Sequence, residues 1–155
     1  MQVDIGIDDG ARTEIVAGLE RLLADTYTLY LKTQNYHWNV EGPMFRALHL
    51  MFEEQYIELR DAVDLVAERI RSLGELAPGS FAEFAELTVI PEGSGDTDAM
   101  DMVRGLADGH EAAARTARSV VRLAEEAGDV ATADLATVRI ETHEKTAWML
   151  RATAS

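Results

Sequence analysis

The chain has 155 residues, with 28 Asp or Glu against 14 Lys or Arg, so its formal net charge at pH 7 is −14. Such a surface repels nucleic-acid phosphates, which need clustered cations. It suits a protein that attracts metal cations, but solubility alone explains the same charge, and composition does not separate the two. No cysteine is present, which excludes disulfides and thiolate metal sites. No apolar run approaches the roughly 18 residues of a bilayer span, and the acidic N-terminus does not resemble a signal peptide. These features favour a single domain of residues 1–155 in the cytoplasm.

The first half of the chain predicts a short arm followed by two long helices. Residues 1–10 lack periodicity and form the expected arm. Apolar residues then recur at helical spacing from about Arg12 to Val40, with Thr13 as the expected N-cap. After the Gly-Pro break, a second amphipathic pattern runs from about Met44 to Leu73, with apolar residues three, four or seven positions apart.

The second half predicts a long connection and two further helices. Gly74 ends the second helix, and residues 75–95 are rich in Gly, Pro and Ser. Inside this connection, "SFAEFAELT" predicts one or two helical turns that start at Ser80. A third helix is expected from about Asp98 to Ala127, ended by Gly128. A fourth is expected over residues 130–152, and its main apolar positions are Leu135, Val138, Trp148 and Met149.

These elements predict an all-α protein. There is no strand alternation, no internal repeat and no low-complexity tract. Four long helices with short first and last connections and one long crossover are typical of a ferritin-like four-helix bundle. The short helix at Ser80 would be an extra helix in the crossover between helices two and three.

Two of the four histidines, His37 and His49, flank the Gly-Pro break, so an antiparallel hairpin would set them side by side. On a helical wheel, His49, Glu53, Asp64 and Glu68 fall within about 100° of arc beside the apolar stripe. The residues of each pair, His49 with Glu53 and Asp64 with Glu68, are four positions apart. Each pair can therefore direct two ligating atoms at one point.

The two pairs cannot share a metal within one chain, because His49 and Glu68 are about 28 Å apart along the helix. However, Glu53 lies four residues after His49, and Asp64 lies four residues before Glu68, so the two pairs mirror each other along the helix. Two antiparallel copies of this helix about a twofold axis would therefore bring both pairs together. We expect two metal sites per dimer, each with His37, His49 and Glu53 of one chain and Asp64 and Glu68 of the other.

Two imidazoles and three carboxylates suit iron or manganese, and zinc sites more often hold fewer carboxylates. The set offers no cage of six or more oxygens, which argues against calcium. A bridging carboxylate such as Glu68 would permit two metals in one site.

The same residues also have simpler readings. Acidic residues on a helix flank are usually solvated, and His37 beside Trp38 could be a half-buried structural histidine. His110 and His143 lack carboxylates at matching spacing, so they are expected to be structural or surface residues. No Glu-x-x-His occurs, so a site inside the bundle core is not expected. Three further acidic residues of the second helix are expected to be solvated: Glu54, Glu58 and Asp61.

The segment "HWNVEGPMFRALHLMFEEQYIELRDAVDLVAERIRSLG", with the later "HEKTAWMLRA" and the chain length, resembles the Dps family. These are miniferritins, named as DNA-binding proteins from starved cells. The resemblance implies a hollow dodecamer with two-iron centres between subunits at twofold interfaces. Trp38 matches the tryptophan found beside that centre. Five residues match the family's iron ligands: His37, His49, Glu53, Asp64 and Glu68. The family often has Asp at the position of Glu53, whose longer side chain would shift the second iron.

The resemblance implies a ferroxidase that oxidises Fe(II), generally with hydrogen peroxide in preference to oxygen. It also implies storage of ferric mineral inside the cage and protection against oxidative damage. The family takes up iron through acidic threefold pores, for which Asp129 and Asp134 are candidates here. The alternative for these two residues is helix capping by carboxylates near the positive end of the helix dipole.

DNA binding is not expected. Members of the family that bind DNA commonly use tails rich in Lys and Arg. Residues 1–10 contain three Asp and no cation, and the C-terminal "RATAS" has one arginine. Two alternatives to the ferroxidase remain open from the sequence. One is a structural or nucleoid-protecting assembly with a weak metal site, and the other is an isolated dimer that binds zinc as a regulator.

Overall fold

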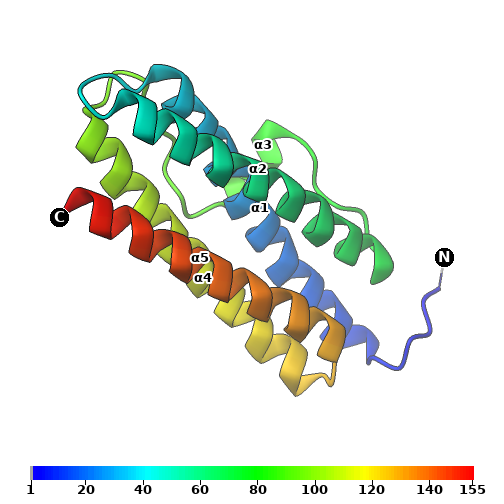
Figure 1. The fold of residues 1–155 in the computed structure, drawn as a ribbon. Coiled ribbons are helices and arrows are strands. Elements are labelled where there is room, and N and C mark those ends of the chain that lie inside the picture. Colours follow the sequence, from blue (N-terminus) through cyan, green and yellow to red (C-terminus); the bar gives the residue numbers. More distant parts are fainter. Residues whose placement is uncertain (1) are drawn as a thin grey trace.

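The computed structural model describes residues 2–155, and it folds that part of the chain into five α-helices (Figure 1). In chain order they are α1 (Asp9–Asn39), α2 (Phe45–Ser72), α3 (Phe81–Leu87), α4 (Ala99–Glu126) and α5 (Val130–Ala154). No strand occurs among these residues, which confirms the all-α prediction. None of the helices is both long and apolar enough to cross a membrane.

The helices form two antiparallel hairpins, α1 with α2 and α4 with α5, which pack together as a four-helix bundle (Figure 1). A crossover of residues 73–98 joins the hairpins and carries the short α3 along α1. The ferritin-like topology with an extra helix in the crossover is therefore confirmed. The two chain ends lie at opposite ends of the bundle (Figure 1).

Short polar contacts set the helix ends, and one of them differs from the prediction. Asp8, not Thr13, caps α1, because its Oδ2 accepts the amide of Ala11 at 3.1 Å. The Thr13 hydroxyl instead donates to a carbonyl one turn earlier, inside the helix. Both residue types are good caps, so spacing alone did not separate them. Gly74 and Gly128 have φ angles of +96° and +72°, the left-handed conformation that ends a helix, as predicted.

The predicted start of the crossover helix at Ser80 is confirmed, and its cause is a capping box. The Ser80 hydroxyl accepts the amide of Glu83 at 3.3 Å. In return, Oε2 of Glu83 accepts the amide of Gly79 at 3.0 Å and the Ser80 hydroxyl at 2.8 Å. These hydrogen bonds, the Gly79 amide foremost, lower the pKa of Glu83. The seven residues of α3 are therefore fixed at their first turn.

The long helices enclose two apolar clusters, each of which takes residues from α1, α2, α4 and α5. The first lies toward the start of α1 and includes Leu22, Val66, Val120 and Ala136. The second lies toward the α1–α2 turn and includes Leu29, Phe52, Leu106 and Leu150. Burial of these side chains, worth about 1.5–3 kcal/mol for each large one, is what holds the hairpins together.

The apolar face predicted for the last helix is correct only at Leu135, which packs against the first apolar cluster. Val138 and Trp148 are 52% and 59% exposed, and Met149 is 39% exposed. The buried face of α5 consists of Thr132, Ala136, Arg139, His143, Ala147 and Leu150. This face is small and polar in its middle, so hydrophobic periodicity pointed to the opposite side of the helix.

A buried carboxylate anchors the crossover to the bundle. Asp25 of α1 is 1% exposed. Its Oδ1 accepts the Thr88 hydroxyl at 2.7 Å and the Val89 amide at 3.0 Å. Its Oδ2 accepts the Thr116 hydroxyl of α4 at 2.6 Å. One side chain thus ties α1, α4 and the crossover together.

We predict that Asp25→Ala lowers the free energy of unfolding by about 1–3 kcal/mol, because it removes the buried acceptor of three part-buried hydrogen bonds, from Thr88, Val89 and Thr116. Denaturant titration measures the loss, and hydrogen exchange at residues 88–90 should accelerate with it. Asp96→Ala, at an exposed position of the same crossover, is the control. Equal stability of the two variants would show that the Asp25 contacts do not hold the crossover.

Candidate metal centre

The α1–α2 turn places His37 and His49 in direct contact. His37 lies in the last turn of α1 and is 7% exposed, and His49 lies in the first turns of α2 and is half-buried. Their rings stack with centroids 3.8 Å apart and planes 12° apart. Each ring also bonds to the other residue's backbone. His37 Nδ1 lies 2.7 Å from the His49 carbonyl, and His49 Nδ1 lies 2.7 Å from the His37 carbonyl.

These reciprocal bonds determine which nitrogen of each ring carries the proton. A backbone carbonyl only accepts hydrogen bonds, so each Nδ1 must donate. In the neutral ring, the lone pair is then on Nε2, which is the form of histidine that binds metals. A backbone carbonyl in this role is the usual outer support of a metal-binding histidine. The turn therefore leaves the Nε2 lone pair of each neutral imidazole outside these two hydrogen bonds.

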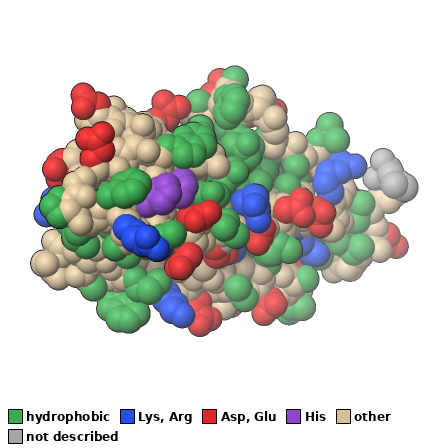
Figure 2. Space-filling view, turned by 45° about the horizontal axis from the view of Figure 1, so that its top comes forward, with side chains coloured by type: hydrophobic (Ala, Val, Ile, Leu, Met, Phe, Trp, Pro, Cys, Tyr) green, Lys and Arg blue, Asp and Glu red, His purple; other side chains and the backbone are tan. Residues whose placement is uncertain are grey.

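Aromatic neighbours keep both rings in place. Phe45 stacks beside His49, with ring centroids 5.0 Å apart and planes 26° apart. Tyr56 meets His37 edge-on at 5.2 Å. Figure 2 shows histidine side chains on the molecular surface, with hydrophobic and acidic side chains around them. Of the pair, His49 is the half-exposed member, so solvent reaches the pair on its side.

The three carboxylates of the predicted ligand set lie on α2 and have no hydrogen-bond or ion-pair partner within residues 2–155. Glu53 is half-buried one turn after His49, while Asp64 and Glu68 are exposed farther along the helix. In the same part of the chain, residues 2–155, no group of three or more His, Cys, Asp or Glu side chains converges on one point. A single chain thus unites the histidines and leaves Asp64 and Glu68 apart.

Asp129 is a helix cap. It is 3% exposed at the start of α5, and it accepts the amide and the hydroxyl of Thr132 at 3.0 and 2.5 Å. Arg69 of α2 donates to it at 2.9 Å. Burial favours a higher pKa for Asp129, but the bonds from Thr132 and Arg69 outweigh it and hold the pKa below its usual value. Asp129 is therefore a helix cap, which was the alternative to a pore residue, whereas Asp134 is exposed.

Comparisons with known proteins agree with this fold. The family described as "Ferritin-like domain" matches residues 16–155. A low temperature-induced protein of Nostoc is 42% identical over 97% of this chain and 85% of its own length. A DNA protection during starvation protein of Brevibacillus brevis is 37% identical over 86% of this chain and 90% of its own. The Dps structure from Vibrio cholerae superposes with a TM-score of 0.92 at 31% identity, covering 99% of this chain and 100% of that one.

The chain belongs to the Dps family of ferritin-like proteins. The Vibrio cholerae protein is described as a member of a broad superfamily of ferritin-like diiron-carboxylate proteins. Membership makes this chain an iron-storage miniferritin. Iron is accordingly the metal to consider for the histidine pair of the α1–α2 turn.

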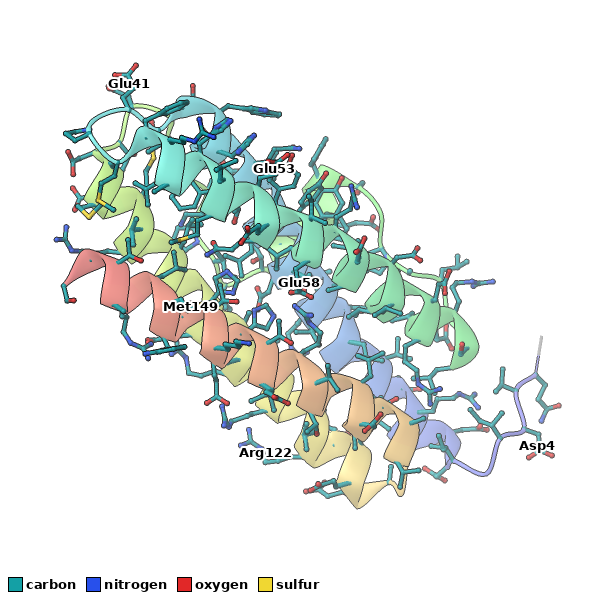
Figure 3. All side chains as sticks on the ribbon, in the orientation of Figure 1. Asp4, Glu41, Glu53, Glu58, Arg122 and Met149 are labelled. Atoms are coloured by element: carbon teal, nitrogen blue, oxygen red, sulfur yellow. The ribbon has the colours of Figure 1, made fainter. Side chains whose placement is uncertain are left out.

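A second histidine pair, unrelated to the first, lies inside the bundle of this Dps-family chain. His110 of α4 and His143 of α5 are 2% and 0% exposed, and their Nδ1 atoms are 2.9 Å apart. Arg139 of α5 contacts His143 Nε2 through Nη2 at 3.3 Å. Its guanidinium also binds Glu58 of α2 in a bidentate ion pair, with N–O distances of 2.6 and 2.8 Å. Figure 3 labels Glu58 on the side of α2 that faces α5.

Sequence reasoning missed this network, which includes Glu58, a residue that was expected to be solvated. The Glu58 side chain does keep 42% of its surface exposed, but no local pattern indicated that Arg139, four residues before His143, reaches across the bundle to that carboxylate. His110 and His143 were expected to be structural or surface residues, and both are buried structural residues. The only signal in the sequence was the spacing of Arg139 and His143, which places two polar side chains on one helix face.

The buried pair resists protonation. Burial lowers the pKa of His110 to about 3, and the nearby charge of Arg139 acts in the same direction. Burial also lowers the pKa of His143 well below 6.5, with further contributions from His110 and Arg139. In an unfolded chain both imidazoles would take up protons near pH 6.5. The folded state is therefore penalised, relative to the unfolded state, as the pH falls below that value.

We predict that His110 removes up to about 1.4 kcal/mol of stability for every pH unit between pH 6.5 and 4.5, and that His143 adds a loss in the same direction below pH 6.5. Above pH 6.5 neither should contribute a pH dependence. Urea titrations at several pH values measure the slope. The double variant His110→Leu, His143→Leu should show a shallower slope across the window, since its carboxylates are unchanged. An identical slope in both proteins would rule out the buried pair as the source.

Proposed function

We propose that the protein is a ferroxidase that oxidises Fe(II) with hydrogen peroxide, or with oxygen, at two-iron centres between subunits. One observation carries the proposal: the reciprocal bonds between His37 and His49, which leave both Nε2 lone pairs free for a cation. The unpaired carboxylates of Glu53, Asp64 and Glu68 supply the remaining donors. Nitrogen and carboxylate donors in this ratio suit iron.

The centre is proposed to form between two copies of the chain, because one copy keeps Asp64 and Glu68 far from the histidines. An antiparallel α2–α2 contact about a twofold axis would bring His49 of one copy to Glu68 of the other. The exposed apolar residues of the neighbouring surface support such a contact. Leu65 of α2 is 57% exposed, and Phe81 and Val89 of the crossover are 73% and 68% exposed. Patches of this kind mark association surfaces.

The proposed reaction uses two irons because peroxide takes two electrons. Each Fe(II) gives up one electron, the O–O bond breaks, and two protons are taken up to release two water molecules. Delivery of both electrons at one centre avoids a free hydroxyl radical. The carboxylates stabilise the Fe(III) product, and the imidazoles fix its position. Trp38 follows His37 in the chain and is 62% exposed, and we place its indole beside the centre.

The wider assignment is a dodecameric cage in the cytoplasm that stores ferric mineral and limits oxidative damage. The net charge of −14 supports it, because an acidic protein concentrates iron cations. Asp134 is the remaining candidate of the two for an acidic uptake pore, since Asp129 is committed to Thr132 and Arg69. The absence of cysteine suits a reducing compartment.

Mixing two inactive variants tests the shared centre. We predict that His37→Ala, His49→Ala and, separately, Asp64→Ala, Glu68→Ala each abolish fast Fe(II) oxidation but still assemble. If the two chains are co-assembled at random in equal amounts, about a quarter of the centres regain every ligand, because only a mixed dimer contains one intact centre. Anaerobic addition of Fe(II) and peroxide, followed by ferric absorbance, measures the recovery.

Two controls make the mixing result decisive. Glu54→Ala and Glu86→Ala, at exposed positions, should oxidise iron at the wild-type rate. Size-exclusion mass must show the same assembly for all chains. No recovery in a verified mixture would place the centre within one chain. Full activity in either parent variant would place it elsewhere.

We predict no DNA binding at physiological salt, because the chain has net charge −14 and no cation in residues 1–10. A gel-shift assay with linear DNA measures this. A control chain that carries an added lysine tail should bind and should lose its affinity as the salt concentration rises. Retardation of DNA by the unmodified chain at about 0.15 M salt would contradict the prediction.

A further inference from the structure

The hydrogen bonds around the buried histidine pair have a single direction. The Glu58 carboxylate only accepts, and the Arg139 guanidinium only donates, so His143 Nε2 must accept from Arg139. In neutral His143 the proton is then on Nδ1, which donates to Nδ1 of His110. The proton of neutral His110 is accordingly on Nε2. This series of hydrogen bonds, which begins at Glu58, therefore ends at the Nε2–H group of His110 inside the bundle.

That terminal N–H has no acceptor among residues 2–155, and a second buried polar group nearby also lacks one. His110 Nε2 makes no hydrogen bond, and neither does the nitrogen or the oxygen of the Gln55 amide. His110 is 2% exposed and Gln55 8%. Arg139 Nε is a fourth buried atom without a partner among residues 2–155. Buried polar atoms are almost always hydrogen-bonded, so the atoms of Gln55 and His110 indicate a polar guest.

The position of Gln55 on α2, together with the hydrogen bonds of Glu58, Arg139 and the histidines, indicates that Gln55 and His110 lie at a similar level of the bundle. Gln55 precedes Glu58 by one turn of α2, and Glu58 is tied through Arg139 and His143 to His110. Gln55 also lies on the buried stripe between Phe52 and Leu59, and His110 lies between Leu106 and Ala113. All four flanking residues belong to one apolar cluster.

We infer that this layer binds one water molecule, which accepts the Nε2–H of His110 and bonds to the amide of Gln55. The nitrogen that faces the guest carries a proton, so it has no lone pair for a metal. The bidentate bond from Arg139 to Glu58 neutralises the one full positive charge nearby, which removes the driving force for an anion. A neutral molecule that both donates and accepts matches the remaining groups.

The bound water has a structural consequence. It joins α2 to α4 through polar groups, while Arg139 joins α2 to α5 and the histidines join α4 to α5. Three helices are then held at one level of the bundle by a closed set of hydrogen bonds. Such a layer fixes the position of each helix along its axis relative to its neighbours, which apolar contacts alone specify less well.

Substitution of Gln55 gives opposite results with and without the water. If the water is bound, Gln55→Leu removes one of its partners, leaves His110 unsatisfied and lowers the urea midpoint. If the layer is dry, the same change removes two unpaired atoms from an apolar stripe and raises the midpoint. Gln34→Leu, at a half-exposed position of α1, is the matched control and should stay close to wild type.

A double-mutant comparison and a crystal structure complete the test. The loss caused by Gln55→Leu should shrink when His110 is already Phe, and an equal loss would show that the two residues share no guest. In a high-resolution crystal structure of the intact assembly we expect one density peak about 2.7–3.2 Å from His110 Nε2. A direct Gln55–His110 bond, an anomalous metal signal, or replacement of the peak by soaked bromide would each overturn the proposal.

Discussion

The proposed chemistry depends on where two protons sit. His37 and His49 each give the Nδ1 proton to the other's backbone carbonyl at 2.7 Å. Because the acceptors are carbonyls, the alternative tautomer would cost both bonds, each worth about 1 kcal/mol and more when buried. The same two bonds close the α1–α2 turn. The local fold and the readiness of the ligands for a metal are therefore one feature, and an event that opened the turn would also release the imidazoles.

The two histidine pairs show how partner atoms give one residue type opposite properties. In the turn, the backbone carbonyls accept the Nδ1 protons, so the lone pair of each neutral ring is on Nε2. In the bundle, the donor Arg139 forces the opposite order, so that the free atom of His110 is an N–H group. The first pair can bind a cation, and the second cannot do so without losing its bond to Arg139. The proposed iron centre therefore lies at the surface of the bundle and not in its interior.

The sequence predicted the features that repeat along helices. Apolar spacing located the four long helices, the segment that starts at Ser80 was recognised as a short helix, and Gly74 and Gly128 marked helix ends. These succeeded because each depends on neighbours in the chain. The position of His37 against His49 was also accessible, since a short antiparallel turn leaves few alternatives.

Features that depend on contacts between distant segments were not accessible. The buried face of α5 was missed because Arg139 and His143 occupy it, and no local pattern shows that Glu58, 81 residues earlier, compensates the guanidinium. The anchor at Asp25 was hidden for the same reason, since its partners lie 63 to 91 residues away. The ligands expected from a second copy are the extreme case, because a single chain keeps Asp64 and Glu68 apart from the histidines.

The arrangement separates stability from reactivity within one helix. On α2, Glu58 faces the bundle and is used by Arg139, whereas Glu53, five residues earlier, has no internal partner (Figure 3). A carboxylate that must accept a cation and tolerate its change of charge has to remain unpaired in the folded chain, because an existing ion pair would compete with the metal. Asp64 and Glu68 are accordingly exposed on α2 and Glu53 is half-buried, and none of the three has an ion-pair partner among residues 2–155. Their charge is therefore available to a cation without the loss of an existing ion pair.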